Sequence, residues 1–214
     1  MRYKLSPSIL AAKLLDLPKT FSILNKYPVS SIHIDIMDGQ FVNNLTIGPS
    51  VVAEIRQLTK IPFYGHLMIL KPENLIRQFL ESGIDVPIFH IEATSSHFEL
   101  VELIKSNKKK AGIAINPDTP VERIYPLLNL IDVVVIMTVK PGFYGQGIIM
   151  KPLENIKYIR KINPDIEIIV DGGVKLSNLH DILKYEPTTI VSSSEIFFSS
   201  DIGKKIEEFL LHFS

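Results

Sequence analysis

The chain has 214 residues, 46% hydrophobic and 21% charged, a composition typical of one globular domain with a large core. Its 23 Lys and Arg residues balance its 23 Asp and Glu residues, so there is no net basic field for nucleic acid or an anionic membrane. The absence of cysteine excludes disulfides, thiolate catalysis and Cys-ligated zinc. Because residues 1–7 lack the apolar core of a signal peptide and no apolar stretch is long enough to cross a bilayer, we expect a cytoplasmic protein.

Predicted strands alternate with predicted helices along the chain. Short apolar or alternating runs indicate strands, whereas apolar residues at helical spacing indicate helices. In chain order the elements are a strand at 5–10, a helix at 14–26, a strand within 31–39, a helix from 49, a strand at 61–69, a helix at 72–82, a strand at 86–92, a helix at 97–105, a strand at 111–116, a helix at 120–128, a strand at 131–139, a helix at 153–162, a strand and turn at 167–173, a helix at 176–184, a strand at 188–192 and a helix at 201–213.

Eight strand–helix units of this kind predict an α/β fold, a single-domain (β/α)8 TIM barrel over residues 1–214. Alternation with helices favours parallel pairing, and strands that are apolar on both sides favour burial on both faces. An open, doubly wound sheet is the alternative. That fold usually carries a Gly-rich nucleotide-binding turn after the first strand, and residues 8–12 contain no glycine.

The second predicted strand sets His33 and Asp35 on one face, because Ile32, Ile34 and Ile36 alternate with them. An imidazole and a carboxylate two residues apart, followed by a turn, indicate half of a metal site at a strand end. A purely structural pairing of the two side chains explains this segment equally well.

Functional groups of a (β/α)8 barrel gather at the carboxyl ends of the strands, and two more candidate ligands fall there. His66 lies on the third predicted strand and Asp171 on the seventh. Two imidazoles and two carboxylates from three strands suit one divalent cation with a position left open for substrate. His66 alone is more typical of a hydrogen-bonded core histidine, and we leave His90 on the fourth strand out of the site on the same ground.

Three loops at the same end of the predicted strands indicate a phosphate site. They are the Gly-rich segments 141–147 and 171–173 and the Ser-rich segment 192–194, which runs into a short predicted helix. Backbone N–H groups of such loops point at an anion, and glycine lets the backbone approach it closely. Each loop taken separately is also explained as a tight turn.

Several motifs follow one another from one end of the chain to the other. They are Ser-Pro-Ser-Ile-Leu (6–10), His-Ile-Asp-Ile-Met-Asp-Gly (33–39), Phe-Val-Asn-Asn-Leu-Thr-Ile-Gly (41–48), Gly-His-Leu-Met (65–68), Asn-Pro-Asp-Thr-Pro (116–120), Met-Thr-Val-Lys-Pro-Gly-Phe (137–143), Gly-Gln (145–146) and Val-Asp-Gly-Gly-Val (170–174). In these motifs the chain resembles the ribulose-phosphate 3-epimerase family over essentially its whole length.

The resemblance implies a barrel of the ribulose-phosphate-binding type that inverts C3 of a ketose phosphate and forms a homo-oligomer. It implies that His33, Asp35, His66 and Asp171 bind one divalent metal ion (Zn²⁺, Fe²⁺, Mn²⁺ or Co²⁺). Asp35 and Asp171 are also the acid–base pair in that family. The expected substrate-binding residues are Ser8, Met37, Met68, Asn116, Met137, Gly142, Gly145, Gly172, Gly173, Ser193 and Ser194.

The chain departs from the family pattern near the expected phosphate site. The departures are Gln40, Asn43, Lys140, Tyr144, Ser193, Ser194 and Glu195. A Cβ at Ser193 would restrict the approach of the backbone to phosphate, and Glu195 would repel a dianion if it faced inward. We expect D-ribulose 5-phosphate as the substrate and D-xylulose 5-phosphate as the product, with D-allulose 6-phosphate or another ketose phosphate as the alternative.

Two further functions remain as alternatives. A decarboxylase of the phosphate-binding barrels needs a lysine between two aspartates on one strand, but Ile36 and Met37 separate Asp35 from Asp38. A barrel that binds a sugar phosphate without catalysis has no need for the complete set of metal ligands that this chain keeps.

Overall fold

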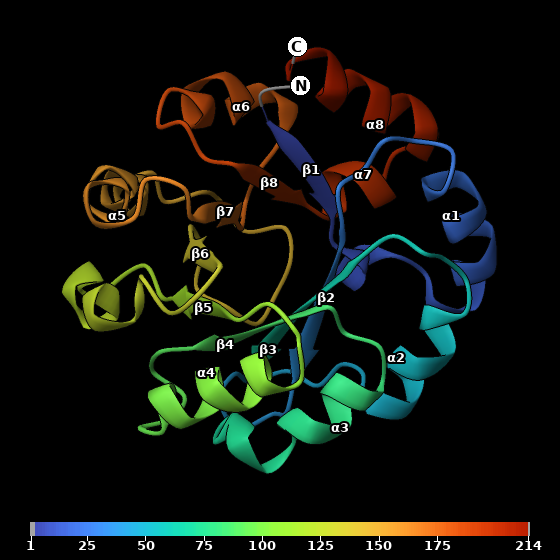
Figure 1. Cartoon of the computed structure of the whole chain (residues 1–214). Coiled ribbons are helices and arrows are strands. Elements are labelled where there is room, and N and C mark those ends of the chain that lie inside the picture. Colours follow the sequence, from blue (N-terminus) through green and yellow to red (C-terminus); the bar gives the residue numbers. More distant parts are fainter. Residues whose placement is uncertain (1–2, 214) are drawn as a thin grey trace.

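The computed structural model describes residues 3–213, so residues 1, 2 and 214 of the predicted domain lie outside the described part. Its eight strands form one sheet that curls into a barrel with the helices outside (Figure 1). The strands are β1 (Lys4–Pro7), β2 (Ile32–Met37), β3 (Phe63–Met68), β4 (Val86–His90), β5 (Gly112–Ile115), β6 (Val133–Met137), β7 (Glu167–Asp171) and β8 (Thr189–Ser192). Together they confirm the predicted (β/α)8 barrel.

The strand order around the sheet is β1-β8-β7-β6-β5-β4-β3-β2, and all the pairs in it are parallel. The ring closes between β1 and β2. A parallel bridge joins Ser8 to His33, and the backbone N–H of Ser30 donates to the carbonyl of Leu5 at 2.9 Å. This closure brings the end of the first strand next to the predicted metal ligands on the second.

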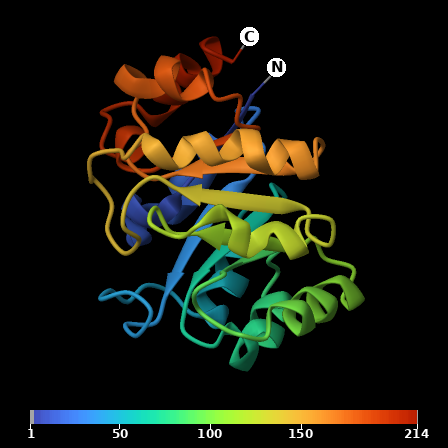
Figure 2. The same ribbon diagram turned by 90° about the vertical axis from the view of Figure 1, so that its left-hand side faces the viewer.

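Helices and 3-10 turns connect successive strands and flank the barrel in both views (Figures 1 and 2). The helices are α1 (Leu17–Leu24), α2 (Pro49–Arg56), α3 (Ile76–Glu81), α4 (His97–Ser106), α5 (Ile156–Ile162), α6 (Leu176–Leu183), α7 (Ser194–Phe197) and α8 (Ile202–Leu211). The 3-10 turns span Ile9–Ala11, Leu14–Asp16, Pro72–Asn74, Val121–Leu127 and Lys151–Asn155. The rings of Tyr3 and Phe213 lie 6.0 Å apart, so the two ends of the described chain meet.

Two predicted elements differ from the structure for local reasons. The predicted strand at 5–10 ends at Pro7, because the hydroxyl of Ser8 accepts a hydrogen bond from the N–H of Leu10 and begins a 3-10 turn. The predicted helix at 120–128 is a 3-10 helix that contains Pro126, a residue without an N–H to donate within an α-helix.

The alternating strands separate two apolar regions. Outward-facing residues such as Ile34, Leu67 and Phe89 pack against the helices in the larger core. Inward-facing residues fill the barrel itself, and they include Ile88, Val135 and Ile169. Because the barrel interior is packed with side chains, we look for a ligand site beyond the strand ends.

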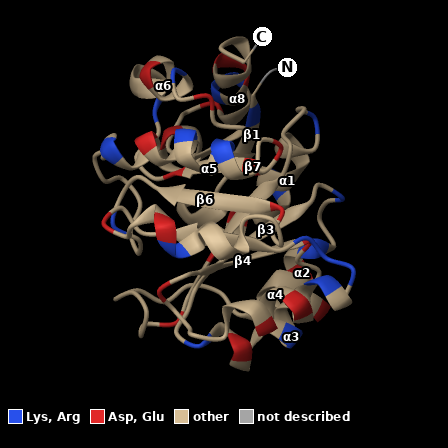
Figure 3. Cartoon of the chain, turned by 60° about the vertical axis from the view of Figure 1, so that its left-hand side comes forward, with Lys and Arg blue, Asp and Glu red and all other residues tan. Residues whose placement is uncertain are grey.

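Basic and acidic residues are interspersed over the outer helices on the face shown in Figure 3. Within residues 3–213, every helix is too short or too polar to span a lipid bilayer.

Candidate active site

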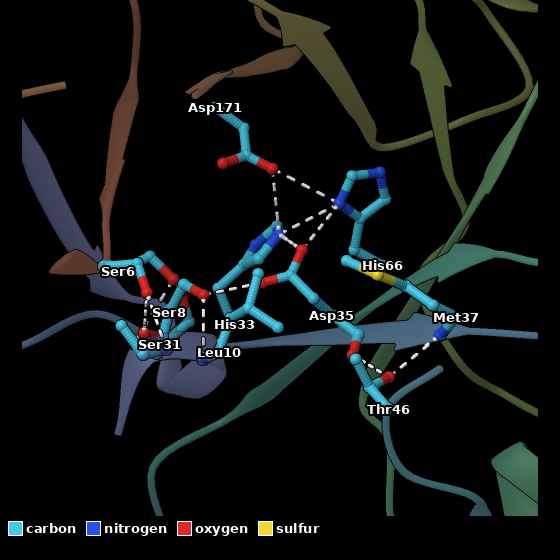
Figure 4. Close-up of polar contacts among 12 residues, drawn as sticks. Ser6, Ser8, Leu10, Ser31, His33, Asp35, Met37, Thr46, His66 and Asp171 are labelled. Atoms are coloured by element: carbon cyan, nitrogen blue, oxygen red, sulfur yellow. Dashed lines mark hydrogen bonds and ion pairs between the residues drawn. The ribbon is translucent and has the colours of Figure 1, made fainter. Parts of the chain in front are cut away.

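Four titratable side chains meet at the carboxyl end of the barrel, and they are the four predicted metal ligands (Figure 4). His33 and Asp35 come from β2, His66 from β3 and Asp171 from β7. All four are buried, with residue exposures of 0% for the two histidines, 7% for Asp35 and 8% for Asp171. The strand register explains the meeting, because Asp35 pairs directly with His66 in the β2–β3 ladder.

One atom of each side chain points to a common centre. His33 Nε2 lies 3.4 Å from Asp35 Oδ1 and 3.2 Å from both Asp171 Oδ2 and His66 Nδ1. His66 Nδ1 is in turn 3.2 Å from the same two carboxylate oxygens. Four ligands at about 2.0–2.1 Å from a tetrahedral metal ion are about 3.3–3.4 Å from one another. The separations in this cluster therefore fit a divalent cation, and the cluster can hold one.

The two carboxylates also create an electrostatic demand for a cation. Burial opposes a charged imidazole, but the charges of Asp35 and Asp171 outweigh it and raise the pKa of His33 to about 10. Burial likewise opposes ionised carboxyls, yet His33 and His66 hold the pKa values of Asp35 and Asp171 below their usual range. Two buried negative charges are stable only beside positive charge, which a protonated imidazole or a metal ion supplies.

Each oxygen of Asp35 has a different neighbour. Oδ1 faces the imidazoles, whereas Oδ2 accepts a hydrogen bond of 2.6 Å from the hydroxyl of Ser8. Thr46 holds the backbone of this segment, since its hydroxyl donates to the carbonyl of Asp35 at 2.7 Å and accepts from the N–H of Met37 at 3.0 Å. The carboxylate is thus fixed on both sides.

His90, which the sequence analysis left out, contacts the site directly. Its Nε2 lies 2.8 Å from His66 Nε2, and its Nδ1 lies 3.1 Å from Glu92 Oε2. Burial lowers the pKa of His90 to about 4. Although burial opposes ionisation of Glu92, hydrogen bonds and charge from His90, together with bonds from Thr119 and Asn116, lower the pKa of Glu92 to about 2. The spacing His90-x-Glu92 on one strand face was the signal available in the sequence.

A pocket above the cluster encloses about 590 Å³ of space, including open solvent at its mouth. The two imidazoles are fully buried beneath it, so Asp35 and Asp171 are the members of the cluster that line its floor. Most of the predicted substrate-binding residues line the same pocket, namely Ser8, Met37, Met68, Met137, Gly142, Gly145, Gly172, Gly173, Ser193 and Ser194.

Asn116 lies in a different position from the other predicted substrate-binding residues. It lines a neighbouring groove that also contains Asn43 and Lys140. Its backbone N–H donates to Glu92 at 2.9 Å, while its buried Oδ1 has no hydrogen-bond partner among the described residues. Contact between Asn116 and a substrate stays a prediction.

Positive backbone φ angles explain why the loop after β7 contains two glycines. Gly172 and Gly173 adopt φ angles of +115° and +67°. A Cβ on Gly173 would lie 2.8 Å from the backbone nitrogen of Ile148, in the loop after β6. Only glycine lets these two loops pack together at the rim of the pocket.

The departures at the end of β8 do not obstruct the pocket in the way the sequence indicated. The Ser193 hydroxyl donates to the carbonyl of Ser8 at 2.8 Å and accepts from the N–H of Ala11 at 3.0 Å, so it joins two loops. Glu195 acts electrostatically on Lys205 of α8, and it is not among the residues that line the pocket. Tyr144 packs edge-on against Phe198, with ring centroids 5.6 Å apart.

Comparison with protein families matches residues 4–197 to the ribulose-phosphate 3 epimerase family. The chain belongs to this family. It is therefore an enzyme of the epimerase class of isomerases, as the motifs predicted.

Two similar relatives illustrate the match. The chain is 37% identical over 210 residues to a ribulose-phosphate 3-epimerase of Bacillus subtilis, covering 96% of this chain and 97% of the relative. It is 38% identical over 210 residues to a chloroplastic ribulose-5-phosphate-3-epimerase of Arabidopsis thaliana, covering 94% of this chain and 74% of the relative.

Solved structures of other barrels share the fold. A 3-hexulose-6-phosphate synthase superposes with a TM-score of 0.76 at 16% identity, covering 99% of this epimerase and all of that chain (100%). KGPDC from Streptococcus mutans gives a TM-score of 0.75 at 14% identity, covering 100% of this epimerase and 98% of that chain. At these identities the likeness concerns the fold alone.

Proposed function

We propose that this epimerase inverts C3 of D-ribulose 5-phosphate to give D-xylulose 5-phosphate, and that one divalent cation bound by the cluster assists the reaction. The observation that carries the proposal is the convergence of Asp35 and Asp171 on the floor of one pocket. The names of the curated relatives support this substrate over a hexulose phosphate.

Inversion needs one proton acceptor and one proton donor on opposite faces of C3, and the two aspartates supply them. One carboxylate takes the proton from C3, and the electron pair of the broken C–H bond moves toward the neighbouring carbonyl. The other aspartate, protonated at that stage, returns a proton to C3 from the opposite side. The strand of Asp171, β7, is separated from β2 by β1 and β8 in the ring, so the two carboxyls approach a substrate from different directions.

The cluster atoms that would hold the cation are His33 Nε2, Asp35 Oδ1, His66 Nδ1 and Asp171 Oδ2. When bound there, a divalent cation would offset the negative charge that develops on the substrate oxygens. Imidazole and carboxylate ligands suit Zn²⁺, Fe²⁺, Mn²⁺ or Co²⁺. Asp35 Oδ2, which the Ser8 hydroxyl contacts, is the oxygen left for proton transfer.

The phosphate group would lie at the rim of the pocket formed by the loops after β7 and β8. Gly172, Gly173, Ser193 and Ser194 line this part, and Lys175 lines the pocket as well. Backbone N–H groups in loops of this kind bind phosphate oxygens. The side chains of Met37, Met68 and Met137 would form the apolar wall against the sugar carbons, and Gly142 and Gly145 would cover it.

An epimerisation assay tests the proposal. The purified chain, stripped of metal and then loaded in turn with Zn²⁺, Fe²⁺, Mn²⁺ and Co²⁺, is given D-ribulose 5-phosphate or D-allulose 6-phosphate. We expect turnover of the pentulose with at least one ion and little without any. Preference for the hexulose would contradict the proposed substrate, and full turnover without metal would contradict the role of the cation.

We also propose that the chain acts as a homo-oligomer in the cytoplasm. The family resemblance supports the first statement, and a cytoplasmic isoform among the relatives supports the second. The relatives also include a chloroplastic enzyme, so both compartments occur in the family. Sedimentation of the purified chain and fractionation of cells that express it test these two statements.

A further inference from the structure

We propose that His90 and Glu92 are positioning residues for His66: they fix the ring hydrogen of His66 on Nε2 and leave the Nδ1 lone pair facing the cluster. The proposal rests on the metal site put forward above and concerns how that site is prepared. We call the three side chains Glu92, His90 and His66 the relay.

The order of hydrogens along the relay follows from its carboxylate end. An ionised carboxylate only accepts hydrogen bonds, and Glu92 Oε2 lies 3.1 Å from His90 Nδ1, so this nitrogen carries hydrogen. The other nitrogen of a neutral His90, Nε2, then bears the lone pair. It lies 2.8 Å from His66 Nε2, which must therefore be the donor.

The last step places the lone pair of His66 on Nδ1. This atom is 3.2 Å from both Asp35 Oδ1 and Asp171 Oδ2. A lone pair that faces two carboxylate oxygens is repelled by them unless a cation lies between. The relay therefore favours the form of His66 that binds a metal ion and disfavours the form that hydrogen-bonds the carboxylates directly.

The geometry of the two rings agrees with a hydrogen bond in the ring planes. The His66 and His90 planes are inclined by 19°, and their centroids are 4.9 Å apart. A face-to-face stack would keep the nitrogens farther apart than 2.8 Å, so the contact is edge to edge. Both histidines are fully buried, and the ring of Phe41 covers His90 at 4.8 Å. Water has no access to replace either partner.

Glu92 is itself held in place from the next strand. Its Oε1 accepts from the backbone N–H of Asn116 at 2.9 Å and from the hydroxyl of Thr119. These two donors occupy Oε1 and leave Oε2 for His90. The end of β5 and the loop after it thus support a metal ligand on β3.

Replacement of Glu92 by Gln gives a specific expectation. The two donors would keep the amide oxygen, so the amide NH₂ would face His90 Nδ1 and require a lone pair there. The hydrogen of His90 would then move to Nε2 and meet the Nε2–H of His66. Two donors in contact force His66 to carry its hydrogen on Nδ1, where it blocks the metal position.

The experiment measures Zn²⁺ affinity by competition with a chelator, together with ¹⁵N NMR of the histidine rings. We expect wild-type protein loaded with Zn²⁺ to show hydrogen on Nε2 of His66 and Zn²⁺ on Nδ1. We expect Glu92→Gln and His90→Phe to bind Zn²⁺ about 10–100-fold more weakly, the usual cost of losing such a supporting contact. The matched control, Glu99→Gln, changes an exposed residue of α4 and should bind as wild type does.

The outcomes separate this proposal from the metal site. Wild-type protein that binds no Zn²⁺ would overturn both. Wild-type affinity in a folded Glu92→Gln, or Zn²⁺ on Nε2 of His66 in the wild-type spectrum, would overturn the relay alone. Thermal unfolding of the metal-free variants shows whether they fold, and the wild-type spectrum decides the matter if they do not.

Discussion

The hydroxyl of Ser8 donates a hydrogen bond of 2.6 Å to Asp35 Oδ2, while the other oxygen of Asp35 faces two imidazoles. One oxygen therefore belongs to the cluster, and the other remains for proton transfer at the pocket floor. Ser8 reaches this position because its bridge to His33 closes the barrel. The closure of the fold thus places a hydrogen-bond donor on a proposed catalytic group.

Ser8→Ala should lower kcat while leaving the affinity for metal within a few-fold of wild type. A hydrogen bond to a charged group contributes about 1.5–3 kcal/mol, which corresponds to a loss of about 10–100-fold. Steady-state kinetics and a Zn²⁺ titration measure the two effects. Ser6→Ala is the control, since Ser6 lies earlier on the same strand and accepts from Ser31 rather than contacting Asp35. Equal losses in the two variants would contradict the role given to Ser8.

Metal binding should release about one proton near neutral pH. The charges of Asp35 and Asp171 overcome the effect of burial and raise the pKa of His33 to about 10, so the ring is protonated in the metal-free protein. A ligand must lose that proton, so the apparent affinity should rise about tenfold per pH unit below this pKa. Calorimetry in two buffers with different ionisation enthalpies counts the proton. Affinity that does not change with pH would contradict this expectation.

Ser193→Ala should destabilise the protein and weaken substrate binding. The hydroxyl makes two hydrogen bonds, to the carbonyl of Ser8 and from the N–H of Ala11. Each is worth about 0.5–1.5 kcal/mol, so unfolding should become about 1–3 kcal/mol easier. Because the same bonds join the loop after β8 to the segment that carries Ser8, KM should rise as well. Denaturant unfolding and kinetics test both; improved phosphate binding in the variant would mean that the side chain obstructs the pocket.

Gly173→Ala should damage the rim of the pocket. Its φ of +67° and the approach of a Cβ to 2.8 Å from the Ile148 nitrogen leave no room for a side chain. Strain of this kind costs about 1–3 kcal/mol. Gly48→Ala is the matched control, because its φ is −101° and a Cβ there meets nothing within 4 Å. Denaturant unfolding should separate the two variants, and equal stability would contradict the close packing of the loops.

Sequence patterns predicted the barrel and the metal ligands because both depend on periodicity within single strands. Alternation in β2 puts His33 and Asp35 inside, and the ends of β3 and β7 bring His66 and Asp171 to the same edge. His90 was left out because the sequence shows spacing along one strand but not the contact with a neighbouring strand.

Other features depend on contacts across great sequence distances. The Ser193 hydroxyl bonds to the segment that follows β1, at the other end of the chain, and no local pattern predicts such a partner. The direction of Glu195, toward Lys205 and away from the pocket, depends in the same way on how α8 packs. Helix type was also misjudged at 121–127, where Pro126 favours a 3-10 helix.

Epimerisation in D₂O tests the two-carboxylate account most directly. With metal-loaded wild-type protein, the D-xylulose 5-phosphate formed from D-ribulose 5-phosphate should carry solvent deuterium at C3, because the proton returned comes from the second aspartate. Asp171→Asn should fold but lose inversion by at least about a hundredfold, the usual contribution of such a group. Product without deuterium, or inversion at the wild-type rate in Asp171→Asn, would contradict it.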